Sequence, residues 1–201
     1  MSHEVTSAVS AEEALKKLKE GNKRFVSGNY SERNIGPERR KELFENGQKP
    51  YAIIVTCSDS RVAPEHIFDA GLGDLFVIRV AGNVINDFVL GSVEYAAEHL
   101  GVQLVVILGH EKCGAVAAAV EGGETHGFIG SIVSKIVKSV QKAMDDSECA
   151  DGICEAAADH NIKEAVEEAQ ESDLIDHLIE EGKLTVVGAK YNLCSGEVVW
   201  F

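Results

Sequence analysis

Four short runs of apolar, largely β-branched residues divide this 201-residue chain, and stretches with a helical pattern separate them. The runs are almost continuously apolar, which is typical of strands in a parallel sheet that is covered on both faces. Alternation of such strands with helices favours right-handed βαβ units. The four runs are Tyr51–Thr56, Leu75–Val80, Val102–Leu108 and Leu184–Ala189.

The segments around these runs complete the expected α/β fold. After a turn, Glu197–Phe201 predicts a terminal strand that pairs antiparallel with the fourth run. We therefore expect a central, mostly parallel β-sheet of four parallel strands plus a C-terminal antiparallel strand, flanked by helices. The predicted helices between the runs are Asp87–Leu100, Gly114–Val120, Phe128–Met144 and Glu155–Ile179.

The first 48 residues carry no strand pattern. A capping box from Ser10 to Glu13 predicts the start of a helix, and Pro37 can begin a second helix that runs towards Asn46. We expect one structural domain overall, in which residues 1–48 form an N-terminal α-helical arm and residues 49–201 form the α/β domain.

The charge and hydropathy of the chain exclude several classes of partner. Its formal net charge is -14, whereas proteins that bind nucleic acids usually present a basic face. The longest apolar runs are too short to span a bilayer. The first thirty or so residues lack the apolar core of a signal peptide and carry acidic residues that a transit peptide avoids. The sequence therefore predicts a cytoplasmic protein with no nucleic-acid and no membrane partner.

Polar residues follow the first and third apolar runs, at the sheet edge where α/β proteins bind ligands. Cys57 follows the first run, and His110-x-x-Cys113 follows the third. The chain has 5 cysteines, an odd number that argues against a disulfide framework. One imidazole and two thiolates suit zinc, and three protein ligands leave a fourth position for water, as in catalytic zinc sites.

Two further features carry possible site chemistry. Asp59 and Arg61 follow Cys57 closely and can form a charge-assisted pair, in which Asp59 accepts a hydrogen bond from a zinc-bound hydroxide. For an Asp-x-Arg sequence taken alone, a loop salt bridge without a metal role is the alternative. Cys149, Cys154 and His160 form a second, weaker candidate metal site, because no paired CxxC spacing supports it.

Together, these motifs resemble the signature of the β-class carbonic anhydrases. The resemblance rests on Cys57-Ser-Asp-Ser-Arg61 and on Gly109-His110-x-x-Cys113-Gly114-Ala115, and it extends to Glu20–Phe25, Arg79–Asn83, Glu94–Ala96 and Val187–Ala189. It implies an enzyme with one Zn2+ per chain, held by Cys57, His110 and Cys113. It also implies the reversible hydration of CO2 to bicarbonate and a proton by attack of zinc-bound hydroxide.

The resemblance also implies roles for other residues and for assembly. Asp59 and Arg61 fall on the catalytic dyad beside the metal, and Gln48 falls on a position that hydrogen-bonds substrate. The positions that line the CO2 pocket are Phe76, Ala81 and Tyr95. In the family, this pocket is completed across a dimer interface. We therefore expect a homodimer or a dimer-based tetramer or octamer, with the helical arm packing on a neighbouring subunit.

Departures within the motifs refine these expectations. Ile54 stands where the bicarbonate-gated subtype typically has Trp, so the sequence predicts the open, non-bicarbonate-gated form. Glu111 and Lys112 stand where the family often has small residues. Two thiolates neutralise the zinc charge before water binds, so activity is expected to rise into the alkaline range. The alternative functions are a carbon disulfide or carbonyl sulfide hydrolase on the same scaffold, or a non-catalytic zinc-binding protein.

Overall fold

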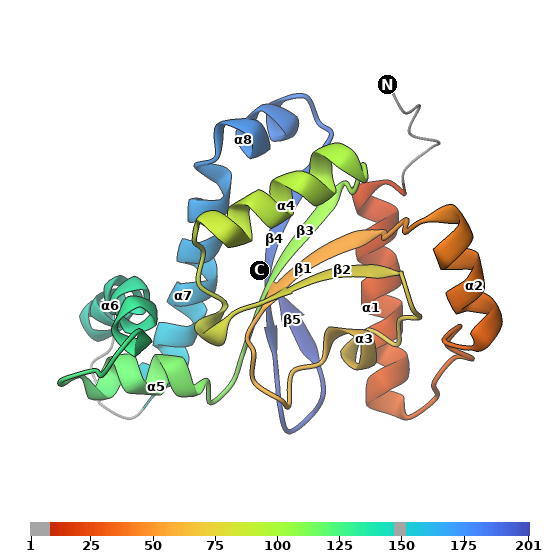
Figure 1. The fold of residues 1–201 in the computed structure, drawn as a ribbon. Coiled ribbons are helices and arrows are strands. Elements are labelled where there is room, and N and C mark those ends of the chain that lie inside the picture. Colours follow the sequence, from red (N-terminus) through yellow and green to blue (C-terminus); the bar gives the residue numbers. More distant parts are fainter. Residues whose placement is uncertain (1–8, 147–151) are drawn as a thin grey trace.

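A computed structural model describes residues 9–146 and 152–201 of the chain. Its sheet has five strands in the order β2-β1-β3-β4-β5, with β4 and β5 antiparallel and every other pair parallel (Figure 1). The expected four parallel strands and the terminal antiparallel strand are therefore confirmed. The strands are β1 (Ala52–Thr56), β2 (Leu75–Arg79), β3 (Leu104–His110), β4 (Thr185–Tyr191) and β5 (Val198–Trp200).

Helices precede the first strand and fill every connection between strands except that between β4 and β5. They are α1 (Ala11–Ser27), α2 (Pro37–Asn46), α3 (Pro64–Ile67), α4 (Asp87–His99), α5 (Gly114–Glu121), α6 (Ile129–Asp146), α7 (Ile153–Gln170) and α8 (Asp173–Glu180), with a 3-10 turn, η1 (Ala81–Asn83). Among the described residues, no helix combines the length and apolarity needed to cross a membrane.

One predicted helix is wrong in its extent. The pattern over Glu155–Ile179 predicts a single helix, but the chain forms two, α7 and α8. The hydroxyl of Ser172 accepts a hydrogen bond from the backbone N–H of Ile175 and so caps the start of α8. Serine is far more favourable at a helix N-cap than inside a helix, which explains why the helix ends here despite the amphipathic pattern.

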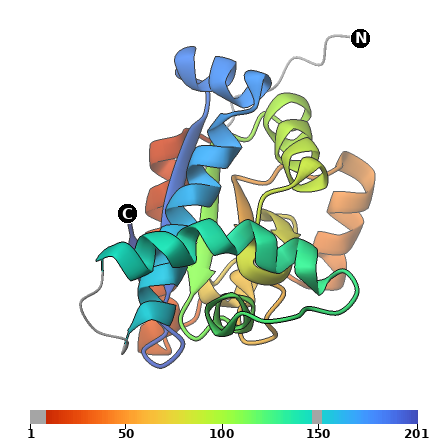
Figure 2. The same cartoon turned by 90° about the vertical axis from the view of Figure 1, so that its left-hand side faces the viewer.

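The two central strands are buried on both faces, as their continuous apolar pattern requires. Every residue of β1 and of β3 is buried. Alternate side chains point to opposite faces of the sheet. One face packs against α4, α7 and α8, and the other packs against α1 and α3 (Figure 1). A third apolar cluster, between α5, α6 and α7, includes Cys57 and Cys113. In Figure 2, α6 lies across α7.

Helix α1 docks on the sheet of its own chain. Leu18 is fully buried, and Gly21 allows close approach, because a Cβ there would lie 1.9 Å from the carbonyl oxygen of Phe68. The Asn22 side chain donates to the carbonyl oxygens of Ile67 and Gly196 and accepts from the backbone N–H of Val198. These contacts fix α1 against α3 and the start of β5.

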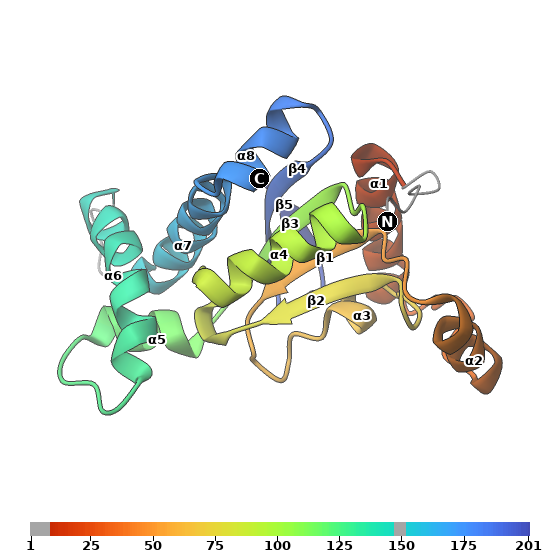
Figure 3. The same ribbon diagram turned by 45° about the horizontal axis from the view of Figure 1, so that its top comes forward.

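Helix α2 behaves differently from α1. It has no buried residue, its Phe44 side chain is 90% exposed, and it stands apart from the sheet (Figure 3). The division of the chain at residue 48 into an arm and an α/β domain stays a prediction.

Candidate active site

The order of the sheet brings Cys57, His110 and Cys113 together. Strands β1 and β3 are adjacent and parallel, with Thr56 opposite Leu108, so their carboxyl ends meet at one edge. Cys57 directly follows β1, His110 ends β3, and Cys113 directly precedes α5. The three side chains are buried, and their ligand atoms all lie within 4.8 Å of one another.

The sulfur of Cys57 accepts hydrogen bonds from two backbone N–H groups. Gly82 donates over 3.3 Å and Asp59 over 3.4 Å. Gly82 has a left-handed backbone (φ 72°), and a Cβ there would lie 2.8 Å from the Cδ1 atom of Ile136. The Asn161 side chain holds this turn by donating to the carbonyl oxygen of Gly82 over 2.8 Å. The turn around η1 therefore aims a donor at Cys57.

The titration of the three side chains is coupled. The neighbouring Cys113 and His110 side chains, together with those two backbone N–H groups, outweigh burial and lower the pKa of Cys57 to about 4. The hydrogen bond with Cys57 and burial in turn raise the pKa of Cys113. Without a cation between them, only one sulfur ionises readily. A divalent cation would stabilise both thiolates.

The imidazole of His110 is also oriented for a cation. Its Nδ1 atom lies 2.8 Å from the carbonyl oxygen of Glu111. An Nδ1–H that donates to this carbonyl leaves the lone pair on Nε2. Nε2 is buried and has no hydrogen-bond partner among the described residues. This nitrogen and two sulfurs fit a metal of zinc type.

Asp59 and Arg61 form a close ion pair beside the cluster. Arg61 donates through Nε to one carboxylate oxygen of Asp59 over 3.0 Å and through Nη2 to the other over 2.6 Å. The hydrogen bonds from Arg61 outweigh burial and hold the pKa of Asp59 well below its usual range. Asp59 is therefore ionised at neutral pH, with its carboxylate directed towards Arg61.

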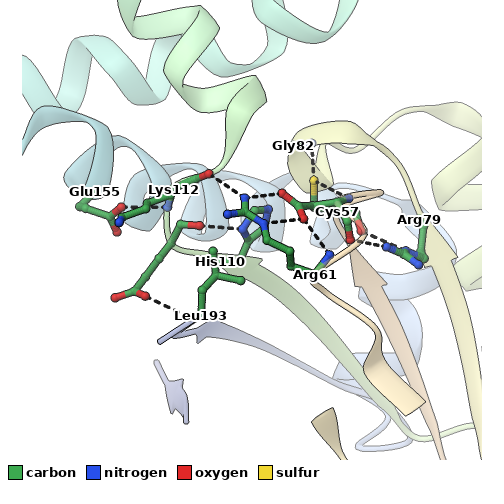
Figure 4. A network of polar contacts seen from close by, with 10 residues as sticks. Cys57, Arg61, Arg79, Gly82, His110, Lys112, Glu155 and Leu193 are labelled. Carbon is green, nitrogen blue, oxygen red and sulfur yellow. Dashed lines mark hydrogen bonds and ion pairs between the residues drawn. The ribbon is translucent and has the colours of Figure 1, made fainter. Parts of the chain in front are cut away.

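Arg79 is a site residue for which the sequence predicted no role. Its guanidinium donates to the carbonyl oxygen of Cys57 over 3.0 Å and to that of Asp59 over 2.6 Å (Figure 4). Arg79 ends β2 directly opposite Thr56 of β1. Its place in the Arg79–Asn83 motif was the only sequence signal that Arg79 belongs to the site. Its hydrogen-bond partners depend on the register of β2 against β1, which the motif does not specify.

A single chain brings only part of the implied CO2 pocket to the cluster. Ala81 begins η1, the turn that contacts Cys57. Phe76 and Tyr95 contact each other, with ring centroids 6.3 Å apart. Phe76 lies opposite Ile53, four residues before Cys57, which places it about 13 Å from Cys57 along the strand direction. These two aromatic side chains therefore lie away from the cluster of the same chain.

Gln48 is also distant from the cluster of its own chain. It lies in the exposed loop before β1, whereas Cys57 follows the other end of that strand. The length of β1 and its flanking residues separates them by roughly 17 Å or more. Contact of Gln48 with substrate at this cluster is therefore not achieved within one chain.

The second candidate metal site receives no support. Cys149 lies outside the described residues. Cys154 is exposed, and the Nε2 atom of His160 lies 3.0 Å from a carboxylate oxygen of Asp146. Within residues 9–146 and 152–201, the cluster of Cys57, His110 and Cys113 is the one group of three or more such ligands that could hold a metal ion.

Comparison with known proteins agrees with this geometry. The family model described as carbonic anhydrase matches residues 52–198. The carbonic anhydrase of Mycolicibacterium smegmatis is 42% identical over 190 residues, which cover 92% of this chain and 90% of that protein. Carbonic anhydrase 2 of Mycobacterium tuberculosis strain H37Rv shows the same identity and coverage. The chain belongs to the carbonic anhydrase family.

Solved structures define the class within this family. The β-carbonic anhydrase CcaA aligns with a TM-score of 0.74 at 28% identity, over 93% of this chain and 94% of that one. A tetrameric β-carbonic anhydrase of Sordaria macrospora aligns with a TM-score of 0.72 at 23% identity, over 82% of this chain and 91% of that one. This chain is accordingly a β-class carbonic anhydrase, as the motif resemblance predicted.

Proposed function

We propose that this enzyme carries out the reversible hydration of CO2 at one Zn2+ held by Cys57, His110 and Cys113. The observation that carries the proposal is the convergence of these three buried ligands within 4.8 Å at the carboxyl edge of the sheet. Two thiolates and one imidazole are ligands that zinc prefers, and a set of three leaves a fourth position for solvent. When bound, zinc supplies an acidified water as the nucleophile.

Asp59 and Arg61 are the proposed catalytic pair. The ionised carboxylate of Asp59 accepts a hydrogen bond from the attacking water and orients its lone pair towards CO2. Arg61 holds both carboxylate oxygens, at 3.0 and 2.6 Å, so it keeps Asp59 turned towards itself. This pairing, together with Ile54 in place of Trp, supports the open, non-bicarbonate-gated form.

We propose that a second copy of the chain completes the CO2 pocket. Gln48, Phe76 and Tyr95 are too far from the cluster of their own chain to act on its substrate. Tyr95 is 48% exposed and Phe44 of α2 is 90% exposed, which favours burial of the helical arm and of α4 against a partner. Assembly as a homodimer, or as a dimer-based tetramer or octamer, would bring these residues to the partner's metal. The Sordaria macrospora enzymes are tetrameric.

Mixing two impaired variants tests the shared pocket. Gln48→Ala and Asp59→Asn chains, co-expressed so that they associate at random, should form mixed dimers that contain one intact site. Hydration activity should then recover to about a quarter of the wild-type value, since half of the dimers are mixed and each has one of two sites intact. If both functions lie in one chain's site, activity in the mixture stays at the average of the two variants.

The proposed reaction is tested by stopped-flow CO2 hydration together with zinc analysis. Purified protein should contain about one zinc per chain and hydrate CO2. Chelation should abolish the activity, and added zinc should restore it. Protein with full zinc but no hydration at alkaline pH would support the non-catalytic alternative. Sulfide release from carbon disulfide or carbonyl sulfide that exceeds CO2 hydration would support the hydrolase alternative. The cytoplasmic location stays a prediction that cell fractionation can check.

A further inference from the structure

One of the two residues between His110 and Cys113 adopts a backbone conformation that needs support. Lys112 has a left-handed backbone, with φ 49°. This region is unfavourable for residues with a Cβ, and it persists only where surrounding contacts hold it. The conformation sets the direction in which the chain passes from one proposed zinc ligand to the next.

A carboxylate from a distant helix provides this support. Glu155, in the first turn of α7, accepts a hydrogen bond from the backbone N–H of Lys112 over 2.9 Å. Glu155 is itself held by Lys190 of β4, whose Nζ atom lies 2.9 Å from carboxylate oxygens of both Glu155 and Asp159. The Lys190 side chain is only 12% exposed, whereas the side chains of Glu155 and Asp159 are 42% and 40% exposed. Lys190 therefore fixes Glu155 in place beside the loop.

The other side of the same peptide segment reaches the catalytic pair. The carbonyl oxygen of Lys112 accepts a hydrogen bond from Nη2 of Arg61 over 3.3 Å, and the same nitrogen donates to Asp59. Figure 4 shows Glu155, Lys112 and Arg61 joined in one continuous network. The position of Lys112 thus connects α7 both to the ligand loop and to Arg61.

We infer that Glu155 is a positioning residue of the active site, which holds the His110–Cys113 loop in its ligand-binding shape through the backbone N–H of Lys112. This inference rests on the proposed function of the cluster. The competing view is that Glu155 only joins α7 to β4 through Lys190. Asp159 offers a matched control, because it also pairs with Lys190 but has no hydrogen bond to the loop.

Five variants separate these views. Glu155→Ala should make the Lys112 amide exchange rapidly with solvent and should weaken zinc binding by about 10- to 100-fold. The absorption of the Co2+-substituted protein, which reports the thiolate geometry, should change as well. Glu155→Gln retains an acceptor oxygen and should keep most of the wild-type values. Asp159→Asn should leave all three readouts at wild-type values.

The fourth variant tests the strain directly. Glycine adopts a left-handed backbone without the penalty of a Cβ. The double variant with Lys112→Gly and Glu155→Ala should therefore recover most of the zinc affinity and of the Co2+ spectrum that Glu155→Ala alone loses. The single variant Lys112→Gly is the reference for this comparison. If Glu155→Ala does not fold, Glu155→Asp replaces it, since its shorter side chain keeps the charge of the α7 first turn but should lose the protection of the Lys112 amide.

The outcomes are distinct. The inference is overturned if the Lys112 amide stays protected without Glu155, if Asp159→Asn loses as much zinc affinity as Glu155→Ala, or if Lys112→Gly restores nothing. Amide exchange of Lys112 is measured on the zinc-free protein too, so it tests the hydrogen bond without catalysis. A wild-type protein that binds no zinc or hydrates no CO2 would instead refute the proposed function.

Discussion

Replacing Asp59 with asparagine removes one negative charge beside the proposed metal site and preserves the size of the side chain. In the wild-type structure, Arg61 keeps Asp59 ionised. A hydrogen bond to a charged acceptor contributes about 1.5–3 kcal/mol. If the attacking water makes this bond in the transition state, its loss should lower kcat/KM for CO2 hydration by about 10- to 150-fold, at about 1.4 kcal/mol for each factor of ten.

The assay is stopped-flow CO2 hydration, normalised to bound zinc, together with urea unfolding. Zinc content should stay near the wild-type value, since Asp59 is not one of the three proposed ligands. The free energy of unfolding should change little, because Arg61 is half-exposed and exposed ion pairs contribute little to stability.

Asp69→Asn is the matched control, since it removes a carboxylate paired with arginine far from the cluster. The Asp69 side chain is fully buried, and Arg24 donates to it over 2.6 Å. Its loss should lower the free energy of unfolding by about 1.5–3 kcal/mol and leave kcat/KM per bound zinc unchanged. An Asp59→Asn enzyme with full zinc and wild-type kcat/KM would refute the role assigned to Asp59. Equal loss of kcat/KM in both variants would show that the assay reports folding.

Three further predictions concern pH and packing. Burial raises the pKa of Asp69, but the hydrogen bonds from Arg24 and Ser31 outweigh it and lower the pKa overall. Asp69 therefore stabilises the fold above its unfolded pKa of about 3.9. The difference in unfolding free energy between wild type and Asp69→Asn should shrink as pH falls below that value, and a constant difference would contradict this assignment. CO2 hydration should rise into the alkaline range because two thiolates neutralise the metal, and a flat stopped-flow profile would contradict it. Gly21→Ala should destabilise the protein by about 3 kcal/mol in urea unfolding, since the new Cβ overlaps the Phe68 carbonyl; an unchanged midpoint would show that α1 shifts freely.

Local pattern accounted for most of the architecture. The apolar runs that predicted β1 and β3 are buried along their whole length, and the Ser10 cap begins α1 as expected. The pattern failed where two local signals competed. The amphipathic repeat continues through Ser172, but the capping hydrogen bond from the backbone N–H of Ile175 to the Ser172 hydroxyl ends one helix and begins another. Hydrophobic periodicity alone does not show whether a serine within the repeat will cap a new helix or lie inside a continuous one.

The candidate site was partly predictable from the same local patterns that predicted the strands. Cys57 and His110 each stand where an apolar strand ends, so their meeting required only that the two strands be neighbours. Arg79 and Gly82 lay in a recognised motif, but their contacts with Cys57 depend on the path of the chain after β2. No sequence pattern marked Glu155 as a site residue, because it follows Cys113 by 42 residues and lies in a helix with many other acidic residues.

By itself, the sequence determined the α/β class, the family and the three candidate metal ligands, because burial on two faces and short-range spacing are properties of local sequence. The tertiary structure decided which side chains from distant segments surround those ligands, and that Gln48, Phe76 and Tyr95 lie away from the cluster of their own chain. Such relations depend on strand order, register and the directions of loops. These arise from packing the whole chain, which no local pattern encodes.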